Sequence, residues 1–149
     1  MYSDRAVADF VQHHFLPVRL HVKDDSTEFQ RVGAMFNAQW TPTVLIVDPP
    51  AAERHRIEGF LPAPDFASQL ALGVAKSAFA RGDFQEAAAA FDELLQKFPD
   101  SEAAPEAQYW AGVSRYKASG DAGALGETAR RFKDRYADTS WAKKASVWG

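Results

Sequence analysis

The chain has 149 residues, of which 46% are hydrophobic and 25% are charged, and its formal net charge is −3. This composition predicts an ordinary globular protein with one domain or two small units. The mild negative charge gives no electrostatic basis for binding nucleic acid or an anionic membrane. Because the sequence contains no cysteine, disulfide bonds, thiolate nucleophiles and zinc–thiolate sites are excluded within these residues.

The start of the sequence gives an expectation about cellular location. The first ten residues, MYSDRAVADF, lack the basic segment and apolar core of a secretory signal. No apolar stretch of the sequence reaches the length that a membrane-spanning helix needs. The sequence therefore predicts a cytoplasmic protein with no contact with a membrane.

The first part of the chain predicts alternating helices and strands. Apolar residues from Val7 to His14 recur at helical spacing, and Pro17–Val22 alternates as a half-buried strand does. Asp25 followed by Glu28 is typical of a capped helix start. The continuous apolar run within Thr43–Val47 predicts a covered strand, and 54–60 alternates weakly, as an edge strand does. We expect about three strands, of which the last two form an antiparallel hairpin.

After Ala67 the composition changes to alanine and aromatic residues at helical spacing, so two domains are predicted, 1–67 and 68–149. A helical period runs from Phe84 to Phe98, and Pro99 ends it. In addition, residues 98–110 align with 136–148 at a constant shift of 38. Self-similarity at this period indicates stacked pairs of helices.

The second domain carries small, aromatic and alanine residues at a fixed spacing. A small residue, an aromatic, an alanine, an aromatic, an apolar residue and a proline follow one another at Gly82, Phe84, Ala87, Phe91, Leu95 and Pro99. This pattern resembles one unit of the tetratricopeptide repeat, and Ala75 and Ala78 occupy positions where that repeat needs small packing residues. The next unit opens with Tyr109–Gly112 and Tyr116, and a third begins at Trp141 and is incomplete after Trp148.

In the first domain, Thr41–Pro42 stands directly before the apolar first strand of the predicted hairpin, and Gly59 and a final helix follow the hairpin. This order resembles a thioredoxin-like α/β domain with a mixed sheet, and Thr41–Pro42 is similar to that family's cis-proline corner. The resemblance implies a cis peptide bond at Pro42 and docking of an extended peptide on Trp40, Thr41, Pro42 and Thr43.

The same resemblance exposes a gap, because the family's Cys-x-x-Cys motif and the central strand before it are missing. Val18–Val22 and Thr43–Val47 would flank that strand on either side. Without it they close up, leave a gap, or accept a strand from elsewhere. An open edge on an apolar strand favours aggregation. The chain is therefore read either as a redox-inactive protein or as a fragment whose Cys-x-x-Cys lies upstream of Met1.

Aromatic residues concentrate in the second domain and have two readings. They could line a peptide-binding groove, or they could pack helices against one another, which repeat aromatics usually do. Packing is favoured for Trp110 and Tyr116. Trp148 differs, because it ends an incomplete unit and is expected to expose its apolar face to a missing helix, a second copy or a partner. The candidate partner-binding residues are Tyr109, Trp110, Tyr116 and Trp148.

Other polar residues give no chemical signal. His13 and His14 are adjacent on a helix and point apart, while His21 and His55 are isolated. Asp24–Asp25 and Glu53 are read as a helix start and a turn rather than as paired catalytic carboxylates. The sequence thus predicts no catalytic residues, no metal and no cofactor.

Two functions of different classes remain open on the sequence alone. The first is a redox-inactive module that binds protein or peptide segments and no nucleic acid, with self-association through the terminal helix left open. The second is part of a thiol–disulfide oxidoreductase whose two cysteines precede Met1. As written, the chain holds no thiolate and is not expected to perform thiol–disulfide exchange.

Overall fold

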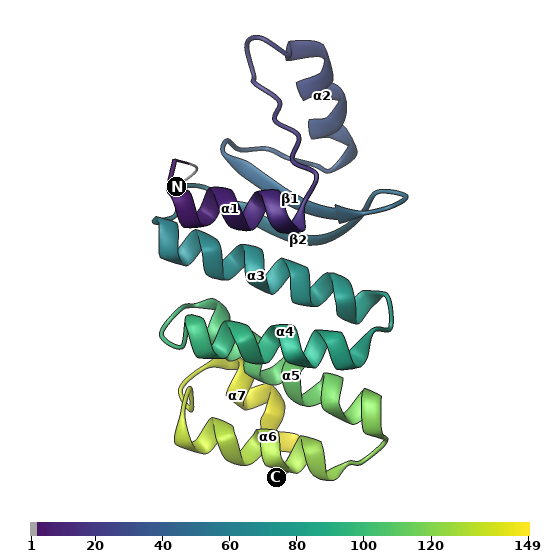
Figure 1. The fold of residues 1–149 in the computed structure, drawn as a ribbon, viewed down its shortest axis with the longest axis vertical. Coiled ribbons are helices and arrows are strands. Elements are labelled where there is room, and N and C mark those ends of the chain that lie inside the picture. The colour runs from purple at the N-terminus through teal and green to yellow at the C-terminus, as the bar shows by residue number, and fades with distance from the viewer. Residues whose placement is uncertain (1–2) are drawn as a thin grey trace. The chain divides into compact units, whose positions relative to one another are not determined.

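The computed structural model describes residues 3–149. The chain divides into two compact units, Met1–Ala67 and Ser68–Gly149, and the boundary falls within helix α3 (Ala63–Ala80). The described chain is mostly helical, with seven α-helices and one small sheet (Figure 1).

The first unit begins with two helices of about three turns each. Helix α1 (Arg5–His14) starts where the Asp4 side chain accepts a hydrogen bond of 3.1 Å from the Val7 amide, and Val7 is buried. Helix α2 (Ser26–Met35) has Asp25 at its N-cap position but no side-chain capping bond. Instead, the Asp25 carboxylate accepts a bond of 2.8 Å from the His21 amide. The predicted helix is confirmed, whereas its predicted capping pair is wrong.

The sheet of the first unit has two strands, β1 (Thr43–Asp48) and β2 (Ala52–Glu58), which pair antiparallel. The turn between them is closed by a bond of 2.7 Å from the Ala51 amide to the Asp48 carbonyl. Ile46 and Ile57 are buried. The predicted hairpin is therefore confirmed, with a register shift after Ile46.

The strand predicted over Pro17–Val22 does not form, and this expectation was wrong. Among residues 3–149 the sheet holds two strands rather than three, and none of 17–22 belongs to it. Val18 and Val22 are 81% and 49% exposed, so of the expected half-buried face only Leu20 is partly buried. The physical reason is that a strand gains its backbone hydrogen bonds from a neighbouring strand, and this segment pairs with none in the described sheet.

The second unit is an array of helices. After α3 come α4 (Phe84–Lys97), α5 (Ala103–Ser119), α6 (Gly123–Asp134), α7 (Ser140–Ala145) and the 3₁₀ turn η1 (Ser146–Trp148). Figure 1 shows α4, α5 and α6 in succession, and α5 packs against α4 and α6 while α7 packs against α5 and α6. The predicted all-helical second half is confirmed.

Small and aromatic residues at helical spacing form the core of this unit. Gly82, with φ of 84°, permits the turn between α3 and α4, because few other residues adopt this left-handed conformation. Gly112 on α5 lies so close to α6 that an added Cβ would be 1.9 Å from the Thr128 hydroxyl oxygen. The buried core cluster consists of Leu72, Ala75, Ala78, Ala87, Phe91, Leu94, Ala103, Ala107 and Ala111.

The helices of the described chain were also compared with the requirements of a bilayer. None of those within 3–149 combines the length and the apolar character that crossing a membrane requires.

Candidate functional site

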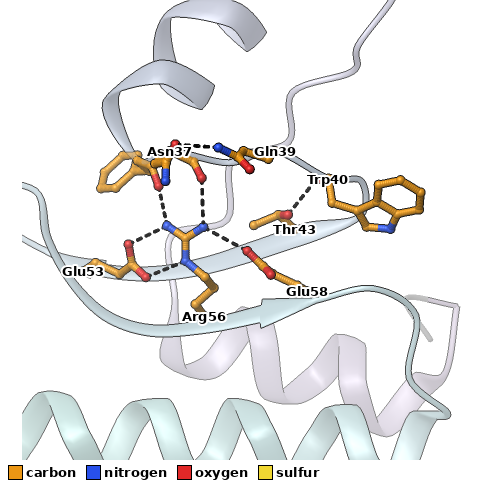
Figure 2. Close-up of polar contacts among 8 residues, drawn as sticks. Asn37, Gln39, Trp40, Thr43, Glu53, Arg56 and Glu58 are labelled. Carbon is orange, nitrogen blue, oxygen red and sulfur yellow. Dashed lines mark hydrogen bonds and ion pairs between the residues drawn. The ribbon is translucent and has the colours of Figure 1, made fainter.

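Arg56 is the centre of a network of polar contacts in the first unit (Figure 2). The guanidinium of Arg56, on β2, donates two hydrogen bonds of 2.7 and 2.8 Å to the carboxylate of Glu53 and one of 3.1 Å to that of Glu58. It also donates to the backbone carbonyls of Phe36 and Asn37, just beyond α2. One side chain therefore joins the end of α2 to β2.

The end of α2 suits this partner electrostatically. Asn37 has φ of 51°, and the Ala38 amide donates a hydrogen bond of 2.8 Å back to the Gly33 carbonyl. These two features define a helix C-terminus that ends in a left-handed residue. Carbonyls at a helix C-terminus carry partial negative charge and favour a cation. The guanidinium of Arg56 supplies that charge and thereby fixes the start of the segment that leads to β1.

The ion pair also shifts the proton affinities of its members. The hydrogen bond from Arg56 lowers the pKa of Glu53 below its ordinary value of 4.5. The bonds to Glu53 and then Glu58 raise the pKa of Arg56. Both groups thus stay charged at neutral pH, so the network persists there as an ionic cluster.

The predicted peptide-docking corner lies at the end of this segment, and its four residues are brought together. The Thr43 hydroxyl donates a hydrogen bond of 2.6 Å to the Trp40 carbonyl, and the Gly59 amide donates one of 2.8 Å to the Pro42 carbonyl. The peptide bond between Thr41 and Pro42 is cis, the form expected for this corner, and so is that between Pro49 and Pro50.

The Trp40 indole is the exposed feature of the corner. Its side chain points away from the Arg56 cluster in Figure 2, and Trp40 is 69% exposed. Thr41 is exposed as well. The corner therefore presents an exposed apolar ring beside the exposed Thr41, in a shape held by hydrogen bonds at Trp40 and Pro42, which suits binding of another chain.

In the second unit, aromatic rings gather around Tyr109 on α5. Its ring centroid lies 5.3 Å from that of Trp110, 5.3 Å from that of Trp141 and 4.8 Å from that of Trp148. The ring planes of Tyr109 and Trp148 are inclined by only 26°. Trp110 in turn contacts Phe79 at 5.1 Å. The structure thus brings together three of the four predicted partner-binding residues, Tyr109, Trp110 and Trp148.

The expectation that Trp148 exposes an unstacked apolar face was wrong. Because the last turn is a 3₁₀ turn, Trp148 packs back on Tyr109 and is half-buried. Its neighbour Val147 is 81% exposed instead. Tyr116 makes none of the ring contacts of this cluster and is exposed at 36%.

The indole of Trp110 combines packing with an unmet polar group. Its Nε1 atom is buried without a hydrogen-bond partner, as is Nε2 of Gln108. An unpaired buried donor costs free energy. The ring packs α5 against α3, which agrees with the packing reading of Trp110 from the sequence, and it is half-buried, so part of it stays accessible to another chain.

Two contributors were missed by sequence reasoning. Arg56 lies in the segment predicted as an edge strand and was not singled out, because its carbonyl partners at Phe36 and Asn37 lie 20 and 19 residues away and carry no side-chain signal. Lys144, whose ammonium lies 3.9 Å from the Trp141 ring centroid, was not singled out from the sequence. The i, i+3 spacing of these two residues is the signal that could have found the pair.

No group of three or more acidic or histidine side chains gathers in a way that could hold a metal ion within residues 3–149. The side chains of the corner and of the aromatic cluster offer hydrogen bonding, apolar contact and charge. These groups suit noncovalent contact with another chain.

Comparison with protein families places one part of the chain. Residues 69–101 match the family described as tetratricopeptide repeat. They cover most of α3, all of α4 and the turn that follows. No curated protein and no solved structure matches the chain.

Proposed function

We propose that this protein is a redox-inactive module that binds protein or peptide segments. The observation that carries the proposal is the tetratricopeptide match over residues 69–101, which falls on the α3–α4 helical hairpin. Repeats of this kind stack into extended surfaces that bind other proteins. Ala75, Ala78, Ala87 and Phe91 are all buried there, as the repeat requires.

The packing of the later helices supports extension of the array beyond the matched repeat. Helix α5 packs on α4, and α6 packs on α5 through the close approach at Gly112. Ala129 and Phe132 on α6 are buried. We therefore assign α5–α6 as a second hairpin of the same type and α7 as the start of a third.

The first unit contributes a second binding surface, the Trp40–Thr43 corner. The exposed indole, the exposure of Thr41 and the bonds that hold Trp40 and Pro42 support this role. We propose a thioredoxin-like origin for this unit, supported by the order of corner, antiparallel hairpin, Gly59 and helix. Because the chain has no cysteine, such a corner holds a peptide without exchanging disulfides.

A second candidate is that the chain is part of a thiol–disulfide oxidoreductase. The observation that favours it is the apolar strand β1, which pairs on one side only in the part of the chain that the structure describes. The missing strand and its Cys-x-x-Cys would then be encoded upstream of Met1. Reading those codons decides it: an in-frame strand followed by Cys-x-x-Cys supports this candidate, and a nearby in-frame stop removes it.

The experiment for the binding function is affinity capture from the native host. The full chain, a Trp40→Ala variant and a Trp110→Ala variant serve as baits, with Val147→Ala as the exposed apolar control. Thermal unfolding of each bait confirms that it is folded, and Trp110→Phe replaces Trp110→Ala if the latter unfolds. Partners lost from either variant and kept by the control support the proposal; if both variants retain every partner, it fails.

A further inference from the structure

The composition of β1 does not match its position in the sheet. β1 reads TVLIVD, with four consecutive apolar residues, and such runs are typical of strands that are covered on both faces inside a larger sheet. β2 reads AERHRIE, in which charged residues recur, as they do on strands whose edge faces water. Yet within residues 3–149 each strand has one neighbour only, so β1 also forms an edge.

The hydrogen-bond pattern identifies which backbone groups of β1 lie on that edge. Because the Gly59 amide donates to the Pro42 carbonyl at 2.8 Å, residues 42 and 59 form a hydrogen-bonded pair. Such pairs alternate along an antiparallel ladder. Val44 and Ile46 therefore bond to β2, whereas the amide and carbonyl of Leu45, opposite Arg56, point to the open edge.

No described segment pairs with this edge, and apolar side chains next to it in the sequence are exposed. Pro17–Val22, which has strand-like alternation, stays unpaired, and no described segment adds to β1. Val47, within β1, and Trp40, three residues before it, are exposed. Most of the exposed large apolar side chains in 3–149 lie in the first unit: Leu16, Val18, Val22, Met35, Trp40, Val47 and Phe60.

The charge on the strand also constrains what could bind. Asp48, the single ionised residue of β1, is paired with Arg54 at 2.9 Å. The edge thus offers backbone donors and acceptors flanked by apolar side chains and no unpaired charge. An occupant that complements it is extended, uncharged along the paired stretch, and rich in valine, isoleucine or leucine.

We propose that the open edge of β1 binds an extended, apolar segment of a partner protein as an added β-strand. This inference rests on the protein-binding function proposed above and names the chemistry of one partner segment. Leu45 supplies the central pair of backbone hydrogen bonds. Trp40 and Val47 cover the two ends of the added strand.

The small size of the edge favours a partner segment over a second copy of the chain. Six residues of strand span about 20 Å. Pairing two folded copies along that length alone falls well short of the roughly 1,200 Å² that stable protein interfaces bury. An extended segment is not limited in this way, because it can also cover neighbouring exposed residues on both sides of the edge.

The test uses a fluorescent peptide of about eight residues, alternating valine and threonine with a terminal lysine at each end. Fluorescence anisotropy measures its binding to the full chain, to Leu45→Pro and to Leu45→Val. Proline removes the outward amide of residue 45 without removing a bond to β2, and valine retains that amide. Val47→Lys, which places a charge on the same edge, is the second variant if Leu45→Pro does not fold.

The expected result is saturable binding that Leu45→Pro or Val47→Lys weakens by about tenfold or more and Leu45→Val leaves within about twofold. Hydrogen exchange at the Leu45 amide should slow when the peptide is added. Absence of binding to the folded chain, or equal binding to all variants, overturns the proposal. Two further outcomes also overturn it. If the protein grows in size with concentration and Val47→Lys abolishes that growth, the edge belongs to a second copy. If an in-frame strand is encoded upstream, the edge belongs to the same polypeptide.

The outcomes for the two proposals are separable. Capture of partners that depends on Trp110 while no strand peptide binds leaves the binding function in place and removes only the β1 inference. If the strand peptide binds but affinity capture returns no partner, the wider protein-binding function is removed instead.

Discussion

The guanidinium of Arg56 on β2 donates a hydrogen bond to the backbone carbonyl of Phe36 at the end of α2, 20 residues earlier in the chain. This contact, with the neighbouring bond to the Asn37 carbonyl, fixes the segment that ends in the Trp40–Thr43 corner. The shape of the candidate docking corner therefore depends on a residue outside it.

Replacing Arg56 should loosen the corner. In Arg56→Gln, the carbonyls of Phe36 and Asn37 lose their cationic partner, so we expect faster hydrogen exchange at the amides of Ala38 and Gly59. The control is Arg31→Gln, because Arg31 pairs with Glu28 within α2. Equal exchange rates in the two variants would show that Arg56 does not hold this segment.

The acid sensitivity of the first unit should be traceable to Glu53. Its pKa is lowered in the folded protein by the hydrogen bond from Arg56, so it contributes stability above its ordinary value of 4.5, and that stability is lost as the pH falls through the lowered pKa. An NMR titration of the Glu53 carboxyl should give a midpoint below 4.5, and Arg56→Gln should raise it. A midpoint unaffected by Arg56→Gln would contradict the ion pair.

Two glycines of the helical unit should respond oppositely to alanine. Gly112→Ala places a Cβ 1.9 Å from the Thr128 hydroxyl oxygen, and such overpacking costs about 1–3 kcal/mol. For Gly126→Ala the nearest atom is 3.7 Å away, so the gain in helix propensity of about 0.5–1 kcal/mol should prevail. Urea unfolding measures both, and a neutral Gly112→Ala would mean that α5 and α6 pack less closely than described.

The last turn should stabilise the helical unit through Trp148. Removing its stack on Tyr109 in Trp148→Ala should cost about 1–2 kcal/mol, from a lost aromatic pair and lost apolar burial. Val147→Ala, at an 81% exposed position, should remain within about 0.5 kcal/mol of the wild type. Thermal unfolding followed by near-ultraviolet circular dichroism measures the stability of both variants. If Trp148→Ala loses no more stability than Val147→Ala, the Trp148 side chain lies in solvent as that of Val147 does.

The sequence predicted the elements whose signal is local. The helical period over Phe84–Phe98 and its end at Pro99 yielded α4, and the apolar run before Asp48 yielded β1. The strand predicted over Pro17–Val22 failed because alternation indicates which face would be buried but supplies no pairing partner. Local pattern is therefore a good guide here to helices and a poor one to sheet membership.

The candidate site was predictable in part for the same reason. The Trp40–Thr43 corner carries a proline before an apolar run, which is visible in the sequence. The contacts of Arg56 with backbone carbonyls are not visible, because a carbonyl belongs to every residue. Trp148 was misjudged because the switch from α7 to a 3₁₀ turn, which rotates its ring onto Tyr109, has no clear signature in AKKASVW.

The most direct measurement is a titration of one captured partner, purified, against the full chain and its variants. Calorimetry should give saturable binding to the wild type and to Val147→Ala, with affinity at least about tenfold weaker for Trp40→Ala or for Trp110→Phe at unchanged thermal stability. Affinities that are equal for all four proteins, or the absence of saturable binding, would contradict the claim that these two surfaces make the chain a protein-binding module.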